Sequence, residues 1–270
     1  MMRARVVLLL LVAMPLFAED GPAKRAAHAV GQELLRYRDD AKSLATAPLH
    51  WDKHEWERFG EGVAVVASLY ATDHSLYDAV QENRSRFSND VAKHITQFGG
   101  GRAMQLSLLM IATGAGMRNP TLRDAGRDSL ESELWAAGVV TPLLKRTFGR
   151  ARPSQLEGSH SFHPLANRFE SFPSGHATNA FAFATAVAAH YDGWLVPTIV
   201  YSVASGVAFS RVNDRAHFPS DVVAGALIGH AAAQGIAARH SGRAKRAWMI
   251  VPVLAPRTAG LLFHYTPSSR

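Results

Sequence analysis

Three apolar stretches in the second half of the chain restrict its fold most strongly. They cover residues 180–189, 194–209 and 222–233, and each is rich in Ala and Gly and interrupted by polar residues or by Pro197. A membrane-spanning helix needs about 20 predominantly apolar residues and is usually richer in large aliphatic side chains. We therefore predict buried helices of a soluble bundle, with membrane-spanning helices as the less favoured alternative.

Helical patterns cover most of the remaining chain. Residues 24–45 and 54–70 alternate apolar and charged positions with helical spacing, the second stretch ending at turn signals around Thr72 and Asp73. Residues 104–116 read as a buried helix, and Asp128 with Glu131 resembles a capping box that starts the next helix. The fold class is thus predicted to be all-α, a single helical-bundle domain. Residues 248–256 and 259–265 add a small C-terminal β-hairpin.

The N-terminus has the layout of a secretory signal peptide. Arg3 and Arg5 precede an apolar run over residues 6–17, and Ala18 precedes the first acidic residues. Because the run is shorter than a spanning helix requires, we predict removal of residues 1–18 and a periplasmic or secreted protein. Tethering to the inner membrane by an uncleaved N-terminus is the alternative.

The net charge of +7 favours anionic partners such as phosphate esters or membrane surfaces. Nucleic acid is not expected, because the basic residues are scattered and no aromatic and basic stripe or zinc-finger spacing is present. The chain has no cysteine, which excludes disulfides and thiolate chemistry.

The segment KRTFGRARP places Lys145 seven residues before Arg152, which Pro153 follows. A helix end with one cation therefore runs into an extended segment with another. Arg offers a planar fork that fits phosphate oxygens and Lys a compact point charge, so the pair suits an anion. Taken alone, the segment fits a solvated basic face equally well.

The segment PSGH, residues 173–176, lies just before the first of the apolar stretches. Pro173 is tolerated at a helix start and Gly175 permits close approach of the backbone, so Ser174, Gly175 and His176 are predicted at a helix N-terminus. Free amides and the helix dipole favour an anion at such a position. Taken alone, this segment is better explained by an ordinary capped helix with an incidental histidine.

The segment SRVNDRAHFPSD precedes the last apolar stretch. Pro219 marks a helix start, which puts Asp221 in the first turn and His217 just ahead of it. A carboxylate that accepts from one imidazole nitrogen leaves the other as a nucleophile or base, and Arg211 adds a third cation. In the alternative interpretation, Asp221 only caps the helix.

Together, the three segments have the order and spacing of the type 2 phosphatidic acid phosphatase family, which this chain resembles from Lys145 to Asp221. That family includes bacterial acid phosphatases, lipid phosphate phosphatases and vanadium haloperoxidases, and has a largely helical core. The resemblance implies a phosphatase core over residues 100–240, between an N-terminal helical region, 19–99, and a C-terminal segment, 241–270.

The resemblance also implies a role for each residue of the three segments. His217 would attack phosphorus, Asp221 would orient it, and His176 would protonate the leaving alcohol and then activate water. The phosphate oxygens would be bound by Lys145, Arg152, Ser174, Gly175 and Arg211.

We expect no metal and no other cofactor, because no cluster of His and carboxylates with metal-ligand spacing stands out; vanadate should inhibit. The expected substrate is a phosphate monoester, with lipid phosphates and diphosphates included and peripheral contact with a membrane surface. The oligomeric state is left open. Two alternatives are a haloperoxidase in which His217 binds vanadate as the cofactor, and a non-enzymatic phosphate-binding envelope protein. A phosphate-binding protein of this kind would not need two titratable histidines.

Overall fold

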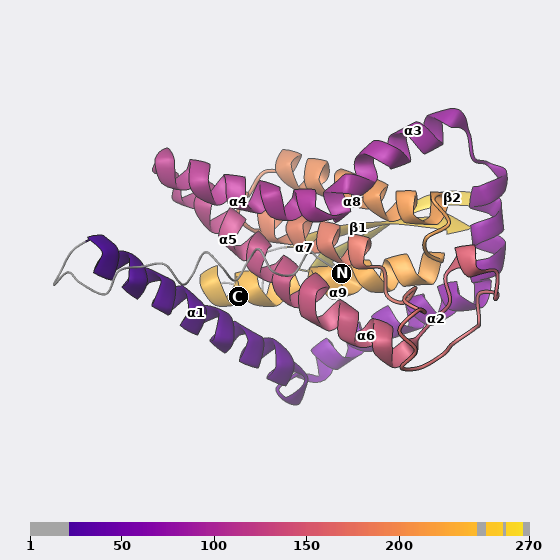
Figure 1. Cartoon of the computed structure of the whole chain (residues 1–270), viewed down its shortest axis with the longest axis horizontal. Helices are drawn as coiled ribbons and strands as arrows, with labels where there is room; N and C mark the ends of the chain where they lie inside the picture. Colours follow the sequence, from indigo (N-terminus) through magenta and orange to yellow (C-terminus); the bar gives the residue numbers. More distant parts are fainter. Residues whose placement is uncertain (1–21, 242–246, 256–257, 267–270) are drawn as a thin grey trace. The chain divides into compact units, whose positions relative to one another are not determined.

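The computed structural model describes residues 22–241, 247–255 and 258–266, so the predicted signal peptide lies outside the described residues (Figure 1). The chain separates into two units, Met1–Leu49 and His50–Arg270. The first unit contributes helix α1 (Pro22–Thr46), which matches the amphipathic pattern, and a short 3-10 helix, η2 (Ala47–Leu49).

The second unit is predominantly helical, and the all-α prediction is confirmed. Its two strands, β1 (Ala247–Ala255) and β2 (Thr258–Thr266), pair antiparallel as the predicted C-terminal hairpin. The helical elements are α2 (Lys53–Glu82), α3 (Arg86–Ile95), η3 (Thr96–Gly99), α4 (Gly101–Gly116), α5 (Pro120–Trp135), the π-helix η4 (Ala136–Val140), α6 (Thr141–Phe148), η5 (Pro153–Gln155), α7 (Gly175–Ala189), α8 (Leu195–Asn213) and α9 (Pro219–Ser241).

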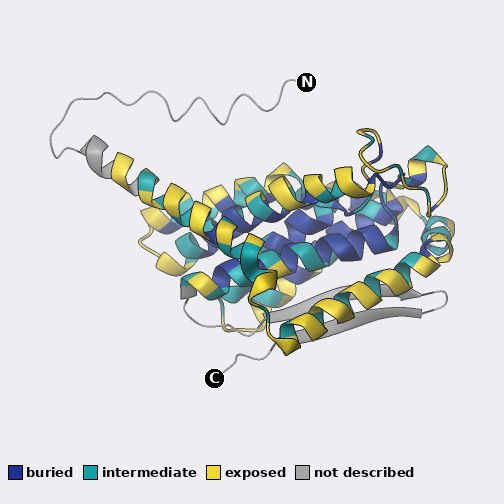
Figure 2. Cartoon of the chain, turned by 90° about the horizontal axis from the view of Figure 1, so that it is seen from below, coloured by how far each residue is buried: buried dark blue, intermediate teal, exposed yellow. Residues whose placement is uncertain are grey.

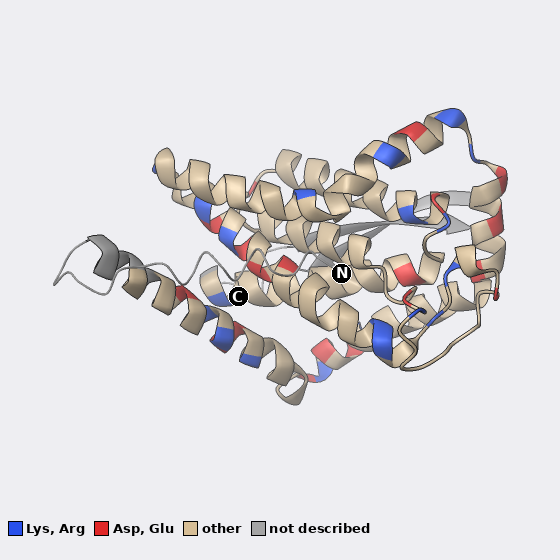
Figure 3. Ribbon diagram, in the orientation of Figure 1, with Lys and Arg blue, Asp and Glu red and all other residues tan. Residues whose placement is uncertain are grey.

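Helix α7 forms the centre of the second unit, where it packs against α5, α8 and α9 (Figure 1). It carries no Lys, Arg, Asp or Glu, and its small side chains are almost all buried (Figures 2 and 3). A Cβ atom on Gly229 of α9 would lie 2.1 Å from the carbonyl oxygen of Thr178, so the two backbones are in contact. The Ala and Gly content of the apolar stretches thus reflects close helix packing.

Helices α8 and α9 are long and apolar enough to cross a bilayer, judged by length and composition alone. The same holds for core helices of soluble proteins, and 61% of the α9 window is buried within the structure.

Two helix boundaries predicted from the sequence are wrong. Helix α2 does not end near Thr72 and Asp73 but continues to Glu82, because the Asp73 carboxylate is fully buried and hydrogen-bonded to groups from other elements. Helix α5 begins at Pro120, where the side chain of Asn119 accepts a hydrogen bond from the Leu122 amide at 3.1 Å.

The residue predicted as the cap, Asp128, lies instead in the middle of α5 and is buried. Its carboxylate contacts His190 Nε2 at 2.8 Å and His240 Nδ1 at 2.6 Å, and these interactions hold its pKa at about 2 despite burial. No sequence pattern linked either histidine to Asp128, so this cluster was not predicted.

Candidate active site

Lys145 and Arg152 are placed by the end of α6. Lys145 lies in the last turn, which ends at Gly149 with a φ of 58°. A Cβ atom there would lie 1.8 Å from the carbonyl oxygen of His163, so only glycine fits. The chain then leaves the helix, and Arg152 follows with extended backbone dihedrals. Lys145 donates to the carbonyl of Glu170, whose carboxylate lies 4.0 Å from Arg152.

Ser174, Gly175 and His176 form the N-terminus of α7, as predicted. Ser174 is the N-cap residue, and its amide donates to the carbonyl of Asp221 at 2.9 Å, which joins the starts of α7 and α9. A Cβ atom on Gly175 would lie 3.6 Å from Thr141 Cγ2 and 3.9 Å from Lys145 Cε, both ordinary contact distances, so the start of α7 lies beside α6.

Arg211, His217 and Asp221 occupy the connection from α8 to α9. Arg211 lies in the last turn of α8 and donates from Nη1 to Thr96 Oγ1 at 2.8 Å. His217 is buried, with Nδ1 3.7 Å from Asp221 Oδ2, an ion-pair separation longer than a hydrogen bond. Because Nδ1 faces the carboxylate, Nε2 is the nitrogen available for chemistry.

The three segments therefore meet at one end of the bundle. Burial, reinforced by Arg211, Lys145 and Arg152, lowers the pKa of His176 to about 4. Burial also lowers the pKa of His217 to about 4, against the opposing effect of Asp221. The pKa of Lys145 falls to about 8, mainly through burial and then through Arg152. Crowded cations and neutral histidines form a site that favours an anion.

The family model for the PAP2 superfamily matches residues 132–245, which include all three segments. The chain carries a PAP2 superfamily domain. The family resemblance read from the motifs is thereby confirmed.

Curated relatives are similar to about a third of this chain. A lipid A 1-phosphatase from Rhizobium etli is 42% identical over 97 residues, which cover 34% of this chain and 41% of the relative. A probable diacylglycerol pyrophosphate phosphatase 1 from Schizosaccharomyces pombe is 30% identical over 129 residues, 36% of this chain and 46% of the relative. The chain thus spans less than half the length of these relatives.

The PAP2 fold is also present in a solved structure from Bacillus subtilis, described as a transmembrane PAP2 type phosphatidylglycerolphosphate phosphatase. The alignment covers 68% of this chain and 94% of the Bacillus subtilis chain, with a TM-score of 0.52 and 24% sequence identity. This likeness concerns the fold.

Buried polar atoms without partners mark the PAP2 site as a place for a ligand. Among the described residues, Ser174 Oγ and Arg211 Nε are buried there without a hydrogen-bond partner. A buried polar group left unpaired costs roughly 1–3 kcal/mol. An unpaired hydroxyl and an unpaired guanidinium nitrogen, together with Lys145 and Arg152, match a ligand with several acceptor oxygens.

The sequence did not predict the groups that hold the Asp221 carboxylate. Its Oδ1 accepts from Arg150 Nη1 at 2.6 Å, and its Oδ2 accepts from Ser171 Oγ at 2.5 Å and from the Phe218 amide at 2.9 Å. The last bond is a helix cap, so Asp221 both caps α9 and faces His217. Arg150 lies inside the segment KRTFGRARP, but nothing in that segment predicts which of its Lys and Arg side chains is buried.

Proposed function

We propose that this chain is a phosphatase that removes phosphate from lipid phosphate monoesters through a phosphohistidine intermediate. The observation that carries the proposal is the arrangement of three cations around a buried His217–Asp221 pair and a second histidine, His176. A binding protein needs the cations but not the two histidines. The names of the curated relatives, which act on lipid A and diacylglycerol pyrophosphate, support the substrate class.

In the first step, Nε2 of His217 attacks phosphorus and the bond from phosphorus to the leaving oxygen breaks. His176 gives its proton to that oxygen, so the product leaves as an alcohol. Asp221 stabilises the positive charge that develops on the His217 ring. Lys145, Arg152 and Arg211 neutralise the phosphoryl oxygens, where charge stabilisation contributes most to phosphoryl transfer.

In the second step, neutral His176 takes a proton from water while the oxygen of that water attacks phosphorus. The bond between phosphorus and Nε2 breaks, which returns His217 to its neutral form and releases inorganic phosphate. Substrate binding prepares the first step, because the negative phosphate offsets the three cations and raises the pKa of His176 from about 4 in the unliganded site.

We propose that the three side-chain cations do the work that metal ions do in other phosphoryl-transfer enzymes, so that no metal is required. Vanadate, which resembles phosphate in shape and charge, should compete with substrate. The same pocket in a haloperoxidase would hold vanadate as the cofactor, but the phosphatase names of the relatives favour hydrolysis.

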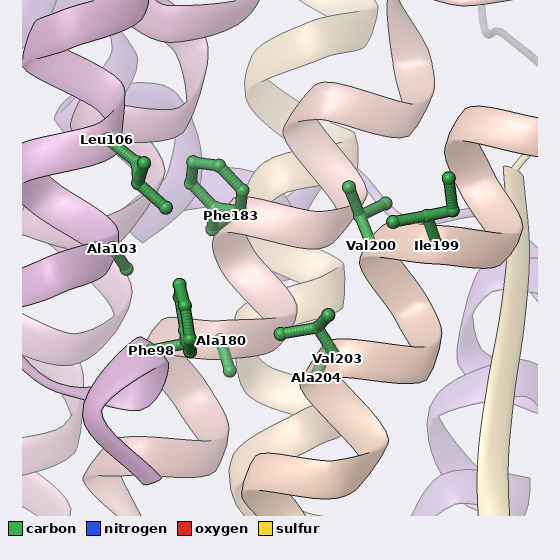
Figure 4. Close-up of a pocket in the computed structure, with 9 residues that line it drawn as sticks. All are labelled: Phe98, Ala103, Leu106, Ala180, Phe183, Ile199, Val200, Val203 and Ala204. Atoms are coloured by element: carbon green, nitrogen blue, oxygen red, sulfur yellow. The ribbon is translucent and has the colours of Figure 1, made fainter. Parts of the chain in front are cut away.

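An apolar cavity of about 190 Å³ supports a lipid substrate (Figure 4). On α7 it is lined by Ala180 and Phe183, four and seven residues after His176, and on α8 by Ala204 and Val203, seven and eight residues before Arg211. Helical periodicity places these positions on the same faces as the two site residues. We propose that the cavity takes part of the acyl chain while the phosphate lies at the helix ends.

The test of this function compares a long-chain lipid phosphate with a short phosphomonoester, both in excess chelator. We expect wild type to hydrolyse both. Val203→Phe, which fills the cavity, should raise KM for the lipid roughly tenfold, since an apolar group contributes about 1–3 kcal/mol in such a pocket. The rate of Val203→Phe on the short ester should stay within about twofold of the wild-type rate, because this substrate has no acyl chain to place in the cavity.

Leu109→Phe is the matched control, because Leu109 is exposed on α4 and does not line the cavity. Loss of all activity in chelator would contradict metal independence. An equal effect of Val203→Phe on both substrates would remove the cavity from the substrate site.

The pH dependence should report Lys145. Its pKa is lowered to about 8, so it is protonated below that pH and loses its charge as the pH rises through it. Since kcat/KM reports groups of the free enzyme, it should decline above the pKa of about 4 of His176 and more steeply above about pH 8, where this phosphate-binding cation is also lost. In Lys145→Arg the guanidinium stays charged, so the steeper decline should move to higher pH; an unchanged profile in this variant would assign that limb to another group.

A further inference from the structure

Arg150 is a fully buried cation directly behind the proposed catalytic pair. Its Nη1 donates to Asp221 Oδ1 at 2.6 Å, and its Nη2 donates to Asp73 Oδ2 at 2.7 Å. Its remaining contacts are to Ser159 O and Ser220 Oγ. Every nitrogen of the guanidinium thus has an acceptor, and the two carboxylates fix the orientation of its plane.

Aromatic rings cover the Arg150 guanidinium. The ring centroids of Phe218, Tyr70 and Phe162 lie 4.6, 5.0 and 5.6 Å from its central carbon. These rings exclude water, so the charges interact more strongly here than at the surface.

Asp73 connects this ion pair to the start of α9. Its Oδ1 accepts from the Ser220 amide at 2.8 Å, and its Oδ2 accepts from the Ser220 hydroxyl. Ser220 immediately precedes Asp221. Asp73 and Arg150 therefore hold the first turn of α9 through hydrogen bonds with both its backbone and its side chains. Asp73 belongs to α2, and no sequence pattern predicted its connection with the site.

We infer that Arg150, held by Asp73, is a positioning residue for the His217–Asp221 pair. It aims the carboxylate at the imidazole and offsets part of the negative charge of the fully buried Asp221. Asp73 in turn balances Arg150, so that enough negative charge remains on Asp221 to stabilise a phosphorylated, cationic His217. The kinetic part of this inference rests on the proposed function, whereas the charge coupling does not.

The other charges around His217 define what must be held constant in a test. They are Lys145 from α6, Arg211 from α8 and Asp221 from α9. None of these is altered by substitutions at Arg150 or Asp73, so any change in the titration of His217 reports the buried network.

The experiment measures the pKa of the His217 imidazole by NMR, and kcat and KM, in Arg150→Gln, Arg150→Lys and Asp73→Asn. Removal of the buried cation in Arg150→Gln should raise the pKa of His217 by about one pH unit or more. Arg150→Lys keeps the charge and should leave that pKa low, while Asp73→Asn should leave it at or below the wild-type value. All three should lower kcat, by about 10- to 100-fold in Arg150→Gln, with KM within about twofold, as expected for residues that orient a catalytic group without touching substrate.

A merely structural role gives a different pattern. Loosening the site would hydrate His217 and raise its pKa in Asp73→Asn as well as in Arg150→Gln, and that result would overturn the inference. So would an unchanged kcat in Arg150→Gln. Asp73→Asn keeps the shape of the side chain, so it tests the network even if a variant at Arg150 does not fold. Arg123→Gln, on a partly exposed arginine paired with Asp124, is the control. If wild type is inactive but the variants show the expected pattern of His217 pKa values, the proposed function is wrong and the charge coupling still stands.

Discussion

Replacing His217 with alanine is expected to reduce phosphate release at least about a thousand-fold, because removal of a covalent nucleophile leaves only binding and charge stabilisation. The imidazole is buried with Nδ1 toward Asp221, which leaves Nε2 for the attack on phosphorus. Wild type quenched during turnover should carry phosphate on His217, detected by mass spectrometry, and His217→Ala should carry none.

Phosphate binding should survive the same substitution. Lys145, Arg152 and Arg211 remain in place, so titration with inorganic phosphate or vanadate should give a Kd close to that of wild type. His94→Ala, on an exposed helical histidine, controls for the general effect of losing an imidazole. Substantial turnover in His217→Ala would remove this residue as the nucleophile and leave direct attack by water as the mechanism to test.

The placement of the site could be predicted because its residues lie where local signals are strong. Pro219 fixes a helix start and Gly149 a helix end, and the side chains next to such breaks gather at the end of a bundle. Short-range chemistry thus predicted the helix ends that carry these side chains, whereas their joining in one site was implied by the family resemblance. Short-range chemistry also predicted that Asp221 lies in the first turn of α9 and His217 just before it.

The buried network behind the site depends on contacts between distant parts of the chain. Asp73 and Arg150 are 77 residues apart, and neither has a local pattern that separates it from an exposed charge. The same holds for Asp128, whose two histidine partners come from the far ends of α7 and α9. A polar residue followed by a plausible turn predicts a helix boundary. Only the tertiary contact that buries the residue shows that the helix continues.

The size of the His176 effect should depend on the leaving group. With an alkyl phosphate, His176→Asn should lower the rate of phosphoenzyme formation by about 10²- to 10⁴-fold, because the alkoxide then leaves without its proton. With 4-nitrophenyl phosphate, whose leaving group departs readily as an anion, the loss in this step should be much smaller. Hydrolysis of the phosphoenzyme still needs His176 as a base, so rapid mixing should show a burst of nitrophenolate followed by slow turnover.

That burst separates the two roles of His176 from a simple contribution to phosphate binding. A residue that only binds phosphate would reduce the rates with both leaving groups equally and give no burst, and this result would contradict the acid and base assignment. The structure supports the distinction, since the pKa of about 4 leaves His176 neutral in the unliganded site and therefore a poor anion ligand. In the proposed mechanism its charge appears only when phosphate offsets Lys145, Arg152 and Arg211, so the substrate itself would generate the acid that expels its alcohol.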